Sequence, residues 1–61
     1  MNTILIIDEE EKIRNLLSKI ISLEGFEVLQ AGDIKSGLRK MDTSEIDVVI
    51  CDVKLPYGMG G

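Results

Sequence analysis

Two apolar runs, each ending at a carboxylate, constrain the fold of this sequence most. Residues 48–51 are apolar up to Asp52, and residues 4–7 are aliphatic up to Asp8. Continuous runs rich in β-branched residues are typical of strands in a parallel sheet, because helices cover both faces of such a sheet. Ligands bind beyond the carboxyl ends of these strands. Each run therefore predicts a buried strand, over residues 4–7 and 46–51, that brings an aspartate to the ligand-binding edge.

The residues between these runs predict two helices with recognisable ends. Asp8 followed by Glu11 has the spacing of a capping box, with Asp in place of Ser or Thr, and Gly25 is expected to end the first helix. Its apolar residues follow helical spacing: Ile13, Leu16, Leu17, Ile20 and Ile21. Asp33 is expected to cap a second helix, followed by a polar turn over residues 41–45. That helix would share one apolar face made of Ile34, Leu38 and Met41.

Residues 26–31 alternate in polarity, which is typical of a half-buried edge strand. The predicted order is therefore β-α-β-α-β, an α/β fold. Crossovers between parallel strands are right-handed in about 98% of cases. In a flavodoxin-like sheet the second strand lies at the edge, the first in the middle and the third beyond it, the order 2-1-3. The ends of the first and third strands then border one crevice.

Composition excludes several classes of protein. The chain has 61 residues, enough for one small domain, and a domain of this size buries only about 60% of its unfolded surface. The net charge of -4 disfavours a nucleic-acid-binding surface. No stretch approaches the roughly 18 apolar residues of a membrane span, so no membrane contact is expected. The single cysteine, Cys51, is expected to be a buried strand residue in a protein of the reducing cytoplasm.

The predicted crevice gathers three carboxylates, those of Asp8, Glu9 and Asp52. Two unit charges about 4 Å apart repel by about 4 kcal/mol at an effective dielectric constant of 20, so such a cluster needs a cation or protons. Mg²⁺ suits it, because this ion takes oxygen ligands and keeps several waters. Each residue also has a simpler interpretation: Asp8 as a helix cap, Glu9 as part of a solvated first turn, and Asp52 as a turn former. Lys54 is more often a solvated turn residue, with only its carbonyl as a candidate ligand.

Two motifs resemble those of a known family. The first is Ile4-Leu5-Ile6-Ile7-Asp8-Glu9-Glu10, and the second is Cys51-Asp52-Val53-Lys54-Leu55-Pro56, followed by Gly60. Together they resemble the first half of a bacterial response-regulator receiver domain. We therefore expect residues 1–61 to be the amino-terminal half of such a domain, which ends after the third of the domain's five strands. Receivers share the flavodoxin-like strand order, so the predicted topology is not independent of this resemblance.

The resemblance implies a role for each candidate residue. Asp52 matches the aspartate that accepts a phosphoryl group from a sensor histidine kinase. Asp8 and Glu9 match the acidic pair that holds Mg²⁺, where the family most often has two aspartates, and the carbonyl of Lys54 matches the third protein ligand. The implied role is that of a phosphoacceptor in cytoplasmic two-component signalling, and not that of an enzyme. An output domain in the parent protein, with transcription regulation as its task, is the implied partner.

In the family, a Ser or Thr and a Lys from later strands complete the site, and both would follow Gly61. We therefore expect the 61-residue chain alone to be phosphorylated slowly, and the strand over 48–51 to expose an apolar edge that favours self-association. A structural, self-associating module without phosphotransfer is the main alternative. A dinucleotide-binding enzyme is a weaker one, suggested by glycines at 58–61. A phosphatase would usually carry a second acid where Lys54 stands.

Overall fold

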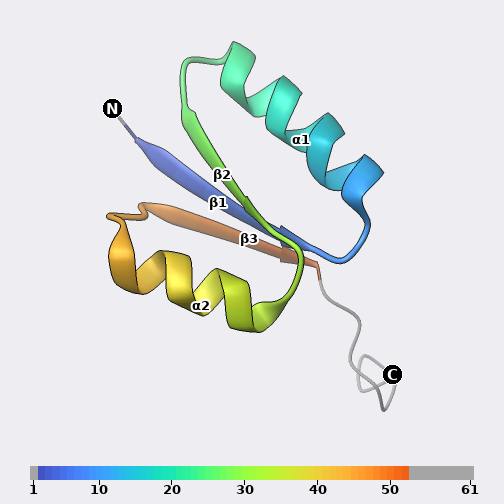
Figure 1. Cartoon of the computed structure of the whole chain (residues 1–61). Coiled ribbons are helices and arrows are strands. Elements are labelled where there is room, and N and C mark those ends of the chain that lie inside the picture. Colours follow the sequence, from blue (N-terminus) through green and yellow to red (C-terminus); the bar gives the residue numbers. More distant parts are fainter. Residues whose placement is uncertain (1, 53–61) are drawn as a thin grey trace, which may run out of the picture.

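The protein is described here by a computed structural model that places residues 2–52 (Figure 1). Three parallel strands form one sheet in the order β2-β1-β3, which confirms the predicted α/β topology. Figure 1 shows the sheet between two helices, with α1 on one face and α2 on the other. The elements are β1 (Thr3–Asp8), α1 (Glu11–Leu23), β2 (Glu27–Ala31), α2 (Ile34–Thr43) and β3 (Val48–Asp52). Within residues 2–52, neither helix has the length and apolar character needed to cross a lipid bilayer.

Strand β1 is the centre of the structure. Its residues pair with β2 on one side, from Thr3 opposite Glu27 to Ile7 opposite Ala31, and with β3 on the other. The four aliphatic residues of the predicted run, 4–7, are buried, and Leu5 and Ile6 have no exposed surface. This burial on both faces explains why β1 reads as a continuous apolar run.

The core on the α2 face is built from alternate residues of two strands. Leu5, Ile7 and Ala31 form its buried cluster, with Leu29 and Ile46 packed against it. Helix α2 approaches this cluster closely through Gly37, which is buried. A Cβ atom at Gly37 would collide with Ile7 Cδ1 and would lie 2.9 Å from Ile7 Cγ1. The missing side chain at Gly37 is therefore what lets α2 pack against β1.

The beginning of α1 differs from the prediction. Asp8 is the last residue of β1, and the N-cap is Glu10, whose side chain makes no capping hydrogen bond within the described part of the chain. Asp8 Oδ1 instead accepts a hydrogen bond from the Glu10 backbone N–H at 2.9 Å. The predicted capping box of Asp8 and Glu11 is wrong, because the strand continues through Asp8 and two residues separate it from the helix.

The other element ends follow the predicted chemistry more closely. Gly25 ends α1 with φ at 94°, the left-handed conformation that glycine adopts without strain. Asp33 caps α2, because its Oδ1 accepts the Ser36 N–H at 2.7 Å. Helix α2 continues to Thr43, where the side-chain hydroxyl donates to the Arg39 carbonyl, so the predicted turn begins at Ser44 and not at residue 41.

Strand β3 lies outside the cover of both helices. In the described structure, no Cα atom of α1 or α2 lies within 8 Å of a β3 Cα atom. Val48 is 50% exposed and Val49 40% exposed. Cys51 is also exposed, so the prediction of a buried cysteine is wrong. The apolar faces of the helices are covered only in part, and their exposed members are Ile13, Leu16, Ile20, Leu23, Ile34, Leu38 and Met41.

The close approach of α2 to β1 predicts the effect of adding one methyl group. We expect Gly37→Ala to lower the free energy of unfolding by about 1 kcal/mol. Overpacking against Ile7 costs roughly 1–3 kcal/mol, which exceeds the gain of about 1 kcal/mol in helix propensity. Ile7→Val removes Cδ1, so the double variant should lose less stability than the sum of the two single variants. Urea unfolding followed by circular dichroism measures this cycle, and a Gly37→Ala protein as stable as the wild type would contradict it.

The Asp33 cap predicts a pH dependence. The hydrogen bond from the Ser36 backbone N–H, with a side-chain contribution from Ser36, lowers the pKa of Asp33 from its ordinary value of 3.8. When the folded-state pKa lies below the unfolded-state pKa, the group stabilises the fold at every pH above the unfolded-state pKa. This stabilisation is lost as the pH falls through the folded-state pKa. An asparagine at this position accepts the same hydrogen bond without titrating. Asp33→Asn should therefore lose less stability than the wild type when urea unfolding is compared at near-neutral pH and at acidic pH. Parallel pH profiles of the two proteins would refute this role.

Candidate functional site

The carboxyl ends of β1 and β3 meet at one edge of the sheet. The two strands are parallel and hydrogen-bonded, and their register places Asp8 opposite Asp52. The predicted meeting of the two strand ends is therefore present in the backbone. For Asp52 the structure describes the backbone only, and Lys54 lies outside the described residues.

Asp8 is buried at this edge, and within the described part of the chain only one of its two carboxylate oxygens has a hydrogen-bond partner. The residue is 3% exposed, and Oδ1 accepts the Glu10 N–H. Oδ2 is buried and has no hydrogen-bond partner among residues 2–52. Most buried polar atoms have a partner, and an unpaired one calls for an explanation such as an ion that is not shown. Oδ2 of Asp8 is thus a candidate ligand atom at this edge.

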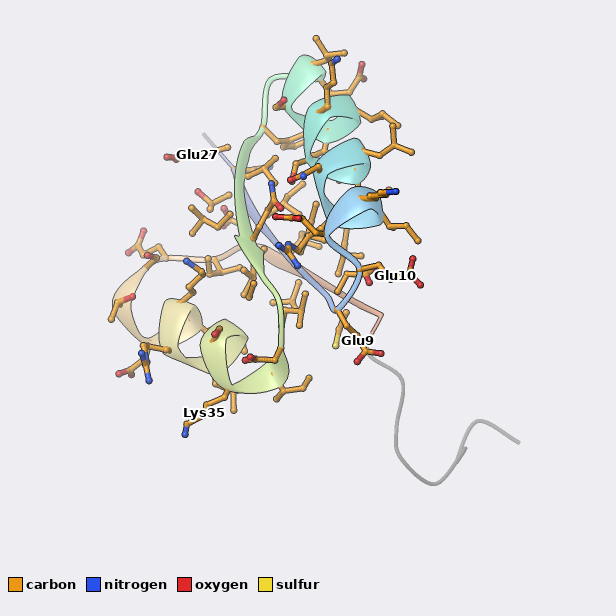
Figure 2. The ribbon with its side chains drawn as sticks, turned by 45° about the vertical axis from the view of Figure 1, so that its right-hand side comes forward. Glu9, Glu10, Glu27 and Lys35 are labelled. Carbon is orange, nitrogen blue, oxygen red and sulfur yellow. The ribbon has the colours of Figure 1, made fainter. Side chains whose placement is uncertain are left out.

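Glu9 and Glu10 form the link between β1 and α1, and both are exposed. Figure 2 shows them where β1 ends, with the Glu10 side chain pointing outward from the ribbon. Among the side chains that the structure describes, no three Asp, Glu, His or Cys residues converge in a way that could hold a metal ion. The described side chains therefore supply at most part of the predicted cluster of Asp8, Glu9 and Asp52.

Arg14 contacts the same edge, although no sequence motif singled it out. Its Nη1 donates to the backbone carbonyl of Asp8 at 2.9 Å, and its Nε donates to Gln30 Oε1 at 3.0 Å. The guanidinium thus joins α1 to the ends of β1 and β2. The available sequence signal was a cation in the first turns of a helix that follows a run of acids, together with a glutamine in the second strand.

The opposite edge of the sheet is fixed by a second set of hydrogen bonds. The Asp47 side chain accepts the Thr3 N–H at 2.7 Å, and the Asp47 N–H donates to the Thr3 carbonyl at 2.9 Å. This pair aligns the start of β3 with the start of β1. Because the strands start in register, they also end in register, and Asp52 reaches the level of Asp8.

Comparison with known proteins agrees with this geometry. Residues 4–61 match the family described as response regulator receiver domain. The chain is 38% identical over 60 residues to the transcriptional regulatory protein CpxR of Klebsiella pneumoniae, covering 98% of this chain and 25% of that protein. It is 38% identical over 61 residues to the sensory transduction protein RegX3 of Mycolicibacterium smegmatis, covering 100% of this chain and 26% of the relative.

A third relative is named as a sensor kinase/phosphatase. The CAI-1 autoinducer sensor kinase/phosphatase CqsS of Vibrio cholerae is 34% identical over 58 residues, which cover 95% of this chain and 8% of that protein. The chain thus spans about a quarter of the two regulators and a smaller share of the kinase. Since the family match includes nearly all of the chain and agrees with the strand order, the chain belongs to the response regulator receiver domain family.

Proposed function

We propose that this chain is the phosphoacceptor part of a two-component signalling protein, with Asp52 as the residue that receives the phosphoryl group. Its donor would be a sensor histidine kinase. The observation that supports this proposal most directly is the buried Oδ2 of Asp8, which has no hydrogen-bond partner among the described residues and belongs to the residue paired with Asp52. The family match and the names of the relatives, which include regulators and a sensor kinase, agree with it.

The oxygen-rich edge fits Mg²⁺. The proposed ligands are the carboxylates of Asp8, Glu9 and Asp52 and the backbone carbonyl of Lys54, and hard oxygen ligands of this kind are those that Mg²⁺ prefers. When bound, the ion would neutralise negative charge on the phosphoryl oxygens. The buried carboxylate of Asp8, already fixed through Oδ1, would present Oδ2 to the cation.

The transfer itself would be a nucleophilic substitution at phosphorus. An oxygen of the Asp52 carboxylate forms the new O–P bond while the N–P bond of the donor's phosphohistidine breaks. The imidazole leaves with the electron pair of that bond. It leaves as a neutral ring if its other nitrogen carries a proton, and otherwise solvent protonates the nitrogen that held the phosphoryl group. The product is an acyl phosphate on Asp52, and the negative charge on phosphorus oxygens is retained throughout.

We further propose that residues 1–61 form the amino-terminal half of a receiver whose parent protein carries an output domain. The support is that β1 is paired on both sides whereas β3 lacks helical cover in the described structure. Relatives that include CpxR are named as transcriptional regulatory proteins, which favours transcription as the output. A single cysteine is consistent with a cytoplasmic site of action.

The proposed cation site predicts a specific effect of Asp8→Asn. Titration of the ¹⁵N-labelled chain with Mn²⁺ should broaden the amide signals of residues 8–10, and excess Mg²⁺ should restore them. Asp8→Asn should abolish this effect, because the amide loses the charge that attracts the ion. Asp42→Asn, on the exposed surface of α2, removes the same charge elsewhere and should bind like the wild type.

The proposed phosphoacceptor predicts a second result. With a small phosphodonor and Mg²⁺, mass spectrometry should find slow modification that Asp52→Asn abolishes.

Two results would contradict this function. One is equal broadening in the wild type and the Asp8→Asn variant, which would place the cation elsewhere. The other is phosphoryl incorporation that persists in the Asp52→Asn variant. Rapid modification of the 61-residue chain would instead contradict the expectation that groups following residue 61 complete the site.

A self-associating module is the second candidate function, and the exposure of β3 favours it. Val48 and Val49 are exposed, no Cα atom of either helix lies within 8 Å of β3 in the described structure, and an apolar strand edge invites pairing with another chain. We propose a second copy of this chain as the partner. This association requires no phosphotransfer.

Sedimentation velocity tests this association. The wild type should sediment faster as its concentration rises, and Val49→Lys should shift it toward the monomer, because a charge on β3 opposes edge pairing. Leu23→Lys is the matched control, since Leu23 is 77% exposed on α1 and away from β3. A wild-type chain that remains a compact monomer at micromolar concentration would rule out this candidate.

A further inference from the structure

Arg14 connects three elements at the edge that carries Asp8. It is the fourth residue of α1, and its own N–H donates to the Glu10 carbonyl in the first turn. Its guanidinium donates through Nη1 to the Asp8 carbonyl and through Nε to the Gln30 side chain. A planar guanidinium holds two acceptors in a fixed relative geometry, which a single ammonium group cannot do.

Two hydrogen bonds outside the strand ladder restrict Asp8, one at its backbone carbonyl and one at its carboxylate. The bond to Arg14 fixes the plane of the peptide that joins Asp8 to Glu9. The bond from the Glu10 N–H fixes the carboxylate through Oδ1. Oδ2 remains as the one carboxylate oxygen of Asp8 that no described residue contacts through a hydrogen bond. The direction in which the chain leaves toward Glu9 and Glu10 therefore depends on the Arg14 contact, and the orientation of Oδ2 depends on it only through the Glu10 N–H.

The position of Arg14 is electrostatically unfavourable for α1, although there is space for its guanidinium. A cation near the N-terminus of a helix lies at the positive end of the helix dipole, which is unfavourable. Gly32 leaves room for the guanidinium at the end of β2, because a Cβ atom there would lie 3.3 Å from Arg14 Nη1, a tight contact. An exposed cation in α1 would need neither this space nor the two acceptors.

We propose that Arg14 is a positioning residue for the cation site: it holds the end of β1 against β2 so that Asp8 and Glu9 are preorganised for Mg²⁺. This inference rests on the proposed function, in which these two residues are ligands. Arg14 itself touches neither the cation nor the phosphoryl group in this proposal. It acts through the backbone carbonyl of Asp8, as outer contacts do when they orient metal ligands.

The test compares Arg14→Met with Lys19→Met in ¹⁵N-labelled protein. Both variants lose one positive charge from α1, and Lys19 is exposed. In the metal-free chain, Arg14→Met should shift the Glu10 amide signal upfield and speed its hydrogen exchange, because the bond to Asp8 Oδ1 loosens. Its Mg²⁺ affinity, measured by competition with Mn²⁺, should fall about tenfold. Lys19→Met should change neither the amide signal nor the affinity by a comparable amount.

Two milder variants keep the test decisive if Arg14→Met fails to fold. Arg14→Lys retains the charge but not the two-point contact, and Gly32→Ala retains Arg14 but crowds Nη1, so both should give smaller changes in the same direction. A Glu10 amide and a Mg²⁺ affinity that match those of Lys19→Met would overturn the proposal. If the wild type binds no Mg²⁺, the proposed function fails, and the metal-free Glu10 signal still decides whether Arg14 holds Asp8.

Discussion

The pairing of β1 with strands on both sides is the interaction on which the rest of this structure depends. β1 lies between β2 and β3, and both helices pack on β1 and β2. Four consecutive aliphatic residues are buried there because each face of β1 is covered and neither edge is free. The same pairing sets the register that brings Asp8 level with Asp52. The position of the acidic edge thus follows directly from the hydrophobic burial of the central strand.

The sequence predicted those features that have a local chemical cause. Gly25 and Asp33 act at helix ends through their own backbone or side-chain chemistry, and both predictions were confirmed. The order of the strands followed from the contrast between continuous and alternating apolar runs, together with the family resemblance. The predicted capping box paired Asp8 with Glu11, whereas the Asp8 carboxylate accepts the Glu10 N–H. The spacing of a capping box does not reveal that the strand extends through Asp8.

Other features depend on contacts between distant residues and leave little trace in the sequence. The exposure of Cys51 results from the lack of a helix over β3 within the described residues, which an apolar run cannot indicate. The Arg14 contact joins a helix side chain to a strand carbonyl, and any residue type can supply that carbonyl. For the site, the sequence predicted which residues end the strands, and the structure adds how Asp8 is held. The roles of Asp8, Glu9, Asp52 and Lys54 in binding a cation or a phosphoryl group are proposals.

The attachment of β3 has a consequence for how the site is assembled. Within the described residues, β3 is held by its ladder with β1 and by the Asp47–Thr3 pair at its start, whereas β1 and β2 are also clamped by two helices. Local unfolding begins where few apolar contacts support the backbone, so β3 is the strand expected to separate from the sheet first. Such separation would carry Asp52 away from Asp8. By linkage, any ligand that requires both residues would stabilise the docked strand, so that occupancy of the site and docking of β3 form a single coupled equilibrium.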